Sequence, residues 1–175
     1  MSFLSLAKKR YSVRKYDSRS VEKEKLLEIL EAGRIAPTAA NIQPQKLIVI
    51  QEAEGLAKLK KAANVHGAPL AIIVCADQNT AWTRPYDKKN TVEIDASIIT
   101  DHMMLEATEL GLGTIWVGYF KPDILRQEFN IPSHIEPVAI LGVGYALGEA
   151  ASPERHDRAR KPLSETVMYE TYTLE

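Results

Sequence analysis

Two short runs of basic residues, one near each end of the chain, are the strongest chemical feature of the sequence. Arg10-Tyr11-Ser12-Val13-Arg14 places two guanidinium groups around a hydroxyl, and Arg158-Ala159-Arg160-Lys161-Pro162 supplies three more cations. Arginine is permanently charged, and its planar fork can bind two oxygens of a phosphate at once. We therefore expect the two runs to converge on one anionic group. For either run alone, the alternative is a solvated basic loop or a disordered basic tail.

Composition limits the kind of protein that carries these runs. The chain has 175 residues, of which 45% are hydrophobic and 26% charged, and its net charge is -1. This length suits a single domain with a real core. The near-neutral balance argues against nucleic acid or a membrane surface as the main partner. We expect one domain over residues 1–175, in which residues 150–175 form an extended C-terminal arm because the composition changes there to Ser, Pro, Arg, His and Lys.

The single cysteine and the N-terminus indicate the compartment. Cys75 lies inside an apolar run, so it is expected to be a small buried side chain, with a catalytic thiol as the lesser alternative. One cysteine allows no disulfide within the chain. Residues 1–10 lack the apolar core of a signal peptide, and no segment is long and uncharged enough to span a bilayer. We expect a cytoplasmic protein.

Hydrophobic periodicity, proline and glycine place the secondary structure. Ser20 is expected to cap a helix that Pro37 ends. The other predicted elements are helices over residues 1–10, 54–63 and 91–110 and from Pro122 onward, strands over 46–51, 69–75, 114–117 and 137–145, and a loop over 77–90.

The helix over residues 91–110 is apolar around most of its circumference. Such a helix is buried in a core or in a subunit interface. Because a chain of this size cannot easily surround so long a helix, we favour an interface. Residues 166–169 have a composition suited to adding a strand, for which a partner chain is one candidate.

Four segments, in order along the chain, resemble the nitroreductase family of FMN flavoproteins. They are the basic-Ser-basic run at 10–14, the Ala-Pro-Thr-Ala-Ala-Asn-Ile-Gln-Pro run at 36–44, Asp95-Ala96-Ser97 leading the long helix into 111–118, and the basic-Pro-Leu run at 158–163. Each segment alone is a weak signal. Their common order and their spread over almost the whole chain make the resemblance specific.

The resemblance implies a fold and an assembly. The family fold is an α+β, nitroreductase-like α/β/α sandwich around a central mixed, mostly antiparallel sheet. Family members form intertwined homodimers with two FMN sites at the interface. Residues of both subunits would therefore contribute to each site.

The resemblance also assigns roles to individual residues. Arg10 would contact the FMN phosphate, Ser12 would hydrogen-bond to the cofactor, and Arg14 would lie near the pyrimidine end of the flavin. Arg160, followed by Arg158 and Lys161, would return to the phosphate. The full set expected at the cofactor is Arg10, Tyr11, Ser12, Arg14, Pro37, Thr38, Ala39, Asn41, Gln43, Ile115, Trp116, Val117, Gly118, Arg158, Arg160 and Lys161.

The turn at residues 37–43 would reach the cofactor of the other subunit. Its small residues permit close approach to the ring, and Asn41 and Gln43 can donate and accept hydrogen bonds. A helix-ending turn without a ligand would explain Pro37 but not the paired amides. Thr38-Ala39 stands where the family often has serines, so one hydroxyl contact is expected to be missing.

Two further segments would face the ring. The backbone of Val117 or Gly118 would approach flavin N5, the atom that accepts hydride, while Gly-x-Gly after a helix is by itself commonly only a cap. Trp82, Arg84 and Tyr86 occupy a region that varies in the family and faces the substrate. They are candidates for substrate contact, with anchoring of a surface loop as the alternative.

The resemblance thus implies an FMN-dependent oxidoreductase. It would pass hydride from NAD(P)H through flavin N5 to an electron-poor small molecule of nitroaromatic or quinone type, by a ping-pong mechanism without a catalytic side chain. One alternative within the family is dehalogenation or flavin breakdown by reduced FMN. An alternative of another class is a flavin-binding dimer without turnover. No metal site is expected, because the histidines lack ligand spacing.

Overall fold

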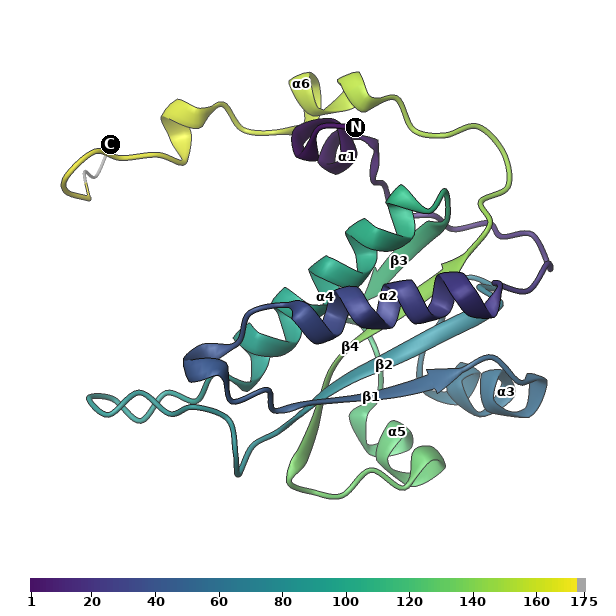
Figure 1. The fold of residues 1–175 in the computed structure, drawn as a ribbon, viewed down its shortest axis with the longest axis horizontal. Helices are drawn as coiled ribbons and strands as arrows, with labels where there is room; N and C mark the ends of the chain where they lie inside the picture. The colour runs from purple at the N-terminus through teal and green to yellow at the C-terminus, as the bar shows by residue number, and fades with distance from the viewer. Residues whose placement is uncertain (173–175) are drawn as a thin grey trace.

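A four-stranded antiparallel sheet forms the centre of the protein (Figure 1). The computed structural model describes residues 1–172. The strands β1 (Gln45–Ile50), β2 (Leu70–Asp77), β3 (Gly113–Val117) and β4 (Ile135–Gly144) lie in the order β1-β2-β4-β3, and each neighbouring pair is antiparallel. A parallel pairing joins Ser12 to Thr114 as an isolated bridge beside β3. The N-terminal segment therefore runs along the edge of the sheet.

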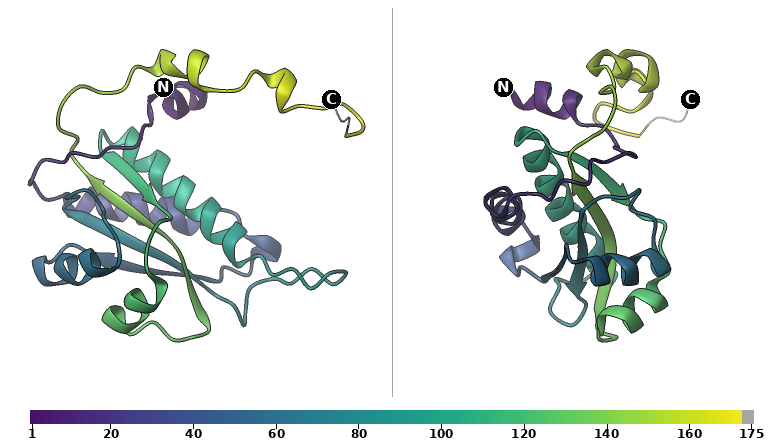
Figure 2. Two further views of the ribbon diagram at one scale, coloured as in Figure 1. Left: turned by 180° about the vertical axis from the view of Figure 1, so that it is seen from behind. Right: turned by 90° about the vertical axis from the view of Figure 1, so that its right-hand side faces the viewer.

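Helices cover both faces of this sheet, and Figure 2 shows the two layers from the edge. The helices α2 (Lys23–Ile35) and α4 (Val92–Glu109) pack together on one face, and α3 (Ala53–Ala62) and α5 (Pro122–Phe129) pack on the other. A separate hydrophobic cluster fills each interlayer space. The expected α+β sandwich is confirmed.

The central strands explain why one predicted strand is a continuous apolar run. Residues 70–76 are all buried, because β2 lies between β1 and β4 and has a helical layer on each side. Alternation of polar and apolar residues is expected only where one face of a sheet meets water. Cys75 is fully buried here, as the sequence predicted.

The N-terminal helix and the first part of the C-terminal arm lie beside each other, outside the layered body (Figure 1). The short helix α1 (Phe3–Lys9) packs near the C-terminal end of α4, and α6 (His156–Ala159) lies against α1 together with the 3-10 turn Pro153–Arg155. The chain then continues past a second 3-10 turn, Leu163–Glu165, away from the body. Residues 157–172 are all exposed.

The predicted secondary structure is confirmed within a few residues of each boundary, with one correction at α2. Ser20 does not cap α2. Instead Glu22 occupies the N-cap position, without a side-chain hydrogen bond to the helix, and the helix begins at Lys23. The Tyr145 hydroxyl lies 2.6 Å from the nearer Glu22 carboxylate oxygen, so a long-range contact fixes this carboxylate outside the helix.

The long helix α4 is only partly enclosed. Its buried face packs on the sheet and on α2, whereas Ile94 is 48% exposed and Ile98 and Leu105 are half-buried. No helix within residues 1–172 has the length and apolarity needed to span a membrane. Residues 166–169 pair with no strand in the described chain.

Candidate functional site

The N-terminal basic run is held along the sheet edge by backbone hydrogen bonds. Val13 N–H donates to the Thr114 carbonyl at 2.8 Å, and Asp17 N–H donates to the Tyr145 carbonyl at 2.8 Å. Val13 is 2% exposed, so the middle of the run is anchored in the core. Arg10 and Arg14, on either side of Val13, are left at the surface of the edge.

A polar cluster around Tyr145 secures the chain after this run. The Tyr145 hydroxyl donates to the Glu22 carboxylate and accepts from Lys25 Nζ at 2.7 Å. The Arg19 guanidinium lies 3.4 Å from the centre of the Tyr145 ring, which is cation–π contact. The hydrogen bond from Tyr145 lowers the pKa of Glu22. Both ends of the segment that contains Arg10 to Arg14 are therefore fixed.

Arg155 fastens the C-terminal arm to the same region. Its guanidinium donates to the backbone carbonyls of Arg10, Lys8 and Ser152, the last two at 3.1 and 2.9 Å. Arg155 was not among the residues predicted from the sequence. Its position three residues before Arg158 was the available signal, but nothing in the sequence indicates three backbone carbonyls as its partners.

The second basic run lies close enough to Arg10 to influence its charge. Burial first, and then the positive charges of Arg155 and Arg160, lower the pKa of Arg10, whereas Asp101 acts in the opposite direction. Charges influence one another this way only when they are close. In the part of the chain that the structure describes, neither Arg10 nor Arg160 forms a close ion pair, and Asp101 offsets the repulsion at Arg10 only in part.

A cavity of about 320 Å³ opens beside Arg10. Lys9, Arg10 and Tyr11 line one side, and Gly113 and Thr114 at the start of β3 line another. Thr114 is 1% exposed, and its hydroxyl has no hydrogen-bond partner. A buried hydroxyl without a partner is unusual in a folded protein. The cavity therefore has the basic residues Lys9 and Arg10 in its wall, whereas the Thr114 hydroxyl itself is enclosed.

The other members of the basic runs are exposed. Arg14 Nη1 lies 3.4 Å from the Ser12 carbonyl, Arg158 is fully at the surface, and Lys161 forms an ion pair with Glu165 at 3.7 Å. A larger cavity of about 630 Å³ lies against α3, where none of the predicted site residues lines it.

The strand β3 presents its backbone and not its side chains. Ile115 and Val117 point into the cluster beneath α3 and α5, whereas Trp116 packs half-buried on the α4 side. Gly118 is exposed, and a Cβ at this position would meet no atom within 4 Å. Of the predicted 115–118 contacts, backbone groups near Gly118 are the ones that a ligand can reach.

The turn at residues 37–43 lies at the other end of α4. Asp95, in the first turn of α4, accepts a hydrogen bond from Ala39 N–H, whereas Thr108 lines the cavity beside Arg10. The 13 residues between Asp95 and Thr108 correspond to about 20 Å of helix. The structure therefore does not bring the turn that carries Asn41 and Gln43 to the cavity beside Arg10 within one protomer.

The predicted substrate residues lie in a hairpin that projects from this same end. Thr83 pairs with Asn90, Arg84 forms an ion pair with Asp87, and Tyr86 near the tip is 97% exposed. Trp82, at the base, is half-buried. Arg84 is therefore engaged within the loop, and Trp82 is the candidate closest to the body of the protein.

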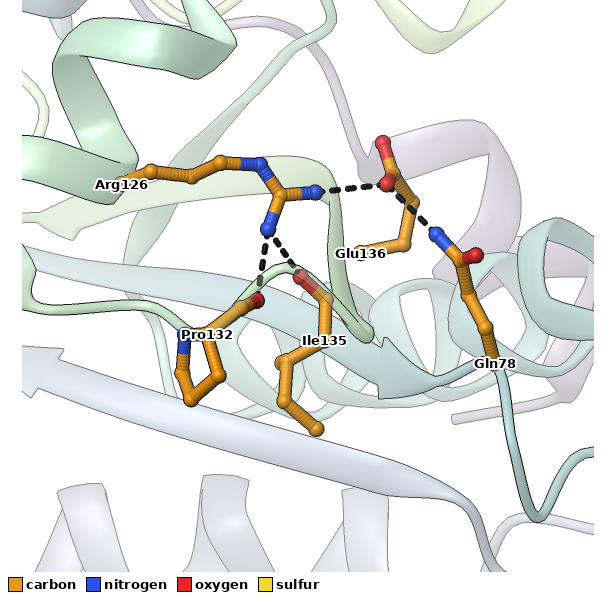
Figure 3. Close-up of polar contacts among 5 residues, drawn as sticks. All are labelled: Gln78, Arg126, Pro132, Ile135 and Glu136. Atoms are coloured by element: carbon orange, nitrogen blue, oxygen red, sulfur yellow. Dashed lines mark hydrogen bonds and ion pairs between the residues drawn. The ribbon is translucent and has the colours of Figure 1, made fainter.

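The base of this hairpin is tied to α5 and β4 (Figure 3). Gln78 Nε2 donates to the Glu136 carboxylate at 2.8 Å, and Arg126 donates to the same oxygen at 2.7 Å. Arg126 also donates to the carbonyls of Pro132 and Ile135, both at 2.7 Å. The hairpin thus starts from a fixed point, although its tip is exposed.

Comparisons with known proteins bear directly on this arrangement. The family model described as "Nitroreductase family" matches residues 7–65 and 56–145, which together make up most of the chain. The chain belongs to the nitroreductase family.

Individual nitroreductase-family proteins are similar over nearly the whole chain. A crystal structure of a nitroreductase family protein from Clostridium difficile 630 is 60% identical, has a TM-score of 0.96, and is matched over 98% of this chain and 100% of that one. An FMN-dependent nitroreductase from Clostridium difficile R20291 is 29% identical, with a TM-score of 0.81 over 97% of this chain and 100% of that one. A protein of Methanothermobacter thermautotrophicus, proposed to be an NADH dehydrogenase or NAD(P)H nitroreductase, is 33% identical over 83% of this chain and 78% of its own length.

The residues present fit the FMN that the nitroreductase family uses. Arg10 and Arg160 provide positive charge without a counterion in the described chain, which suits a phosphate. The cavity beside Arg10, which Lys9 and Tyr11 also line, provides space next to this charge. Within residues 1–172, no three His, Cys, Asp or Glu side chains come together as a metal site.

Proposed function

We propose that this protein is an FMN-dependent NAD(P)H oxidoreductase that reduces an electron-poor small molecule, of nitroaromatic or quinone type. The observation that carries the proposal is that Arg155 and His156 hold the start of the C-terminal arm against residues 8–10, at the cavity beside Arg10, so that the second basic run follows directly from this contact. A nitroreductase relative of 29% identity is named as FMN-dependent, and an FMN reductase of Bacillus subtilis that uses NAD(P)H is 28% identical.

Arg10, Arg158 and Arg160 would bind the phosphate of FMN. Charge-assisted hydrogen bonds from arginine to phosphate are about twice as strong as neutral ones. Binding a dianion would also relieve the repulsion that lowers the pKa of Arg10. Lys161 could also reach the phosphate, because its ion pair with Glu165 is exposed and contributes little free energy.

Two copies of the chain would complete each site. The turn carrying Asn41 and Gln43 lies about 20 Å along α4 from the cavity beside Arg10, estimated from the helical rise. A second subunit can bring its own turn to that cavity. We therefore infer a homodimer, in which the paired amides of one subunit face the flavin bound mainly by the other.

Exposed apolar residues on the two chain ends support this assembly. Phe3 and Leu4 on α1 are 71% and 65% exposed, and Leu163 and Tyr169 on the arm are 77% and 85% exposed. These residues belong to α1 and the C-terminal arm, which both lie outside the layered body (Figure 2). A second copy of the chain would cover them, with residues 150–175 acting as an exchanged arm of a single flavin-binding domain. The last three residues of that arm lie outside the described residues.

The bound cofactor would supply the redox chemistry, since flavin N5 can accept hydride from NAD(P)H and return it to an acceptor in a ping-pong cycle. The chain itself would bind the flavin and orient it and the acceptor. Arg14 would stabilise negative charge at the pyrimidine end of the ring, and the backbone N–H of Val117 or Gly118 would lie near N5. Trp82 and the hairpin beyond it would contact the acceptor.

A visible spectrum of the purified protein tests the proposal. We expect a flavin absorbance band with one FMN per chain, and anaerobic addition of NADH or NADPH should bleach it. A nitroaromatic or a quinone added afterwards should restore the band. A purified protein that neither contains nor takes up FMN, or a bound flavin that neither nicotinamide reduces, would overturn the proposal. Sedimentation at micromolar concentration tests the dimer separately.

A further inference from the structure

Asp95 is a buried carboxylate that joins two loops to the start of α4. It is 1% exposed. Its Oδ1 accepts a hydrogen bond from Ala39 N–H at 2.9 Å, and its Oδ2 lies 2.9 Å from the hydroxyl of Thr91. Burying a carboxylate costs free energy unless hydrogen bonds compensate it. Each oxygen of this carboxylate is used to hold a different segment.

The first of these segments is the turn at residues 38–43, which has a strained backbone. Ala40, Asn41 and Gln43 have φ values of 50°, 54° and 57°, a region that residues with a side chain seldom adopt. Within the turn, Gln43 N–H donates to the Thr38 hydroxyl at 3.0 Å. Strained residues persist only where their surroundings fix them. The hydrogen bond from Ala39 to Asp95 is the contact that ties this turn to α4.

The second segment is the hairpin that begins after β2. Its return strand ends at Thr91, whose N–H donates to the Trp82 carbonyl at 2.9 Å. The Thr91 hydroxyl lies 3.1 Å from the same carbonyl and 2.9 Å from Asp95 Oδ2, so its single proton can go to either acceptor. Thr91 therefore connects the base of the hairpin, where Trp82 lies, to Asp95.

We propose that Asp95 is a positioning residue that holds the turn 38–43 and the hairpin 77–91 in one fixed arrangement. Asn41 and Gln43 on the turn and Trp82 on the hairpin would then be presented together, so that the geometry at the flavin and the geometry at the acceptor depend on one carboxylate. This inference rests on the proposed function for its consequences in catalysis. The connection of the turn to the hairpin is independent of that function, because it consists of the hydrogen bonds of Asp95.

Four variants separate the two halves of the link. Asp95→Ala removes both acceptors, and Asp95→Asn keeps an oxygen for Ala39 N–H. Thr91→Val removes only the hydroxyl that reaches the hairpin, and Thr91→Ser restores it. Thr100→Val is the matched control, because Thr100 is a fully buried threonine of α4 whose hydroxyl donates only to the Ala96 carbonyl.

Amide hydrogen exchange of the flavin-free protein is the readout that needs no cofactor. In Asp95→Ala we expect exchange to accelerate about tenfold or more both in residues 38–43 and in residues 82–91, since one buried hydrogen bond is lost on each side. In Thr91→Val the acceleration should be confined to 82–91. Asp95→Asn should protect 38–43 better than Asp95→Ala, and Thr91→Ser should resemble the parent protein.

Flavin and substrate measurements show whether the link matters for the site. Asp95→Ala should raise the dissociation constant of FMN about tenfold. Thr91→Val should raise KM for a nitroaromatic acceptor by a similar factor, while the FMN dissociation constant and kcat stay within about twofold. Thr100→Val should leave all of these values unchanged.

The outcomes distinguish this proposal from the one on which it rests. Exchange in 38–43 and 82–91 that stays within about twofold of the parent in Asp95→Ala would overturn it, as would a Thr100→Val variant that reproduces the effects of Thr91→Val. If Asp95→Ala does not fold, Thr91→Val decides, and unchanged exchange in 82–91 would overturn the proposal. A parent protein that binds no FMN would instead overturn the proposed function and leave the exchange test intact.

Discussion

Arg155 donates a hydrogen bond to the backbone carbonyl of Arg10, across 145 residues of sequence. This contact lays the C-terminal arm on the last turn of α1 and brings Arg160 near the Arg10 guanidinium. The Arg155 guanidinium thus binds the backbone of Arg10 while its charge repels the Arg10 side chain. A bound phosphate would offset this repulsion between the arginines.

Replacing Arg155 should weaken FMN binding even though its guanidinium donates to backbone carbonyls and not to the ligand. In Arg155→Ala three carbonyls lose their donor and the arm is released, so we expect the FMN dissociation constant to rise about tenfold or more. Titration of the flavin-free protein, followed by flavin fluorescence, measures this. Arg34→Ala removes an equal charge from an exposed ion pair on α2 and serves as the control. Equal affinities in the two variants would show that the arm does not depend on Arg155.

The fold was largely predictable from sequence because its core elements carry strong local signals. The apolar run that became β2 and the helix between Thr91 and Gly111 are specified by composition and by glycine and proline at their ends. Where a long-range contact decides, the sequence was insufficient. Ser20 has the composition of a helix cap, but Glu22 is the N-cap residue, and its carboxylate accepts a hydrogen bond from Tyr145, more than 120 residues away.

The residues expected at the site stay a prediction, and their geometry could not be derived from the sequence. Arg10 and Arg160 were expected to lie near each other because two cationic runs can share one anion. The positive φ values at Ala40 and Gln43 had no local signal, whereas Asn41 is a residue type that adopts this region comparatively often. The roles of Arg155 and Asp95 depend on backbone groups that only the folded chain brings to them.

Two glycines of the β3 region should respond differently to a methyl group. A Cβ at Gly113 would lie 2.6 Å from Val13 Cγ2, whereas a Cβ at Gly118 would meet nothing within 4 Å. Gly113→Ala should lower the free energy of unfolding by about 1–3 kcal/mol, because the core and the basic run must shift. Gly118→Ala should change it by less than about 0.5 kcal/mol. Urea unfolding of the flavin-free proteins compares them, and equal losses would contradict the packing described.

Gly118→Ala has a second expected effect, on flavin binding. If the backbone at Gly118 lies near flavin N5, an added methyl group should raise the FMN dissociation constant or slow reduction by NAD(P)H about tenfold, although stability is retained. Stopped-flow absorbance at the flavin band measures the reduction. Parent-like values for both quantities would remove Gly118 from the site.

The Arg126 network at the base of the hairpin should contribute to stability more than an exposed ion pair (Figure 3). Arg126→Ala removes one donor each from the Pro132 carbonyl, the Ile135 carbonyl and the Glu136 carboxylate, so we expect the free energy of unfolding to fall by about 2–3 kcal/mol, although Gln78 still donates to Glu136 and Ile135 N–H to Pro132. Arg84→Ala, which breaks an exposed pair with Asp87, should cost less than about 1 kcal/mol. Denaturant midpoints of the two variants test this, and the reverse order would refute it.

Burial raises the pKa of the Cys75 thiol to about 12. The free energy of unfolding should therefore fall as the pH becomes alkaline. In the unfolded chain the thiol titrates at about 8.5. Above about pH 8.5 the unfolded chain loses this proton while the folded chain keeps it. The free energy of unfolding is therefore unaffected by this thiol below about pH 8.5 and declines as pH rises toward 12. Between pH 7.5 and 10, the free energy of unfolding of the parent protein should fall by roughly 1–2 kcal/mol more than that of Cys75→Ala. Parallel pH profiles, or rapid labelling of the native thiol by a disulfide reagent at pH 8, would contradict this.

The central claim is that cations from both chain ends bind the phosphate of a single flavin mononucleotide, and comparison of FMN with riboflavin tests it most directly. Riboflavin has the same ring and ribityl chain but no phosphate. We expect the parent protein to bind FMN at least about a hundredfold more tightly than riboflavin, and this preference should largely disappear in Arg10→Ala and in Arg160→Ala. Equal affinity for the two flavins in the parent protein, or a preference that survives both substitutions, would contradict the account.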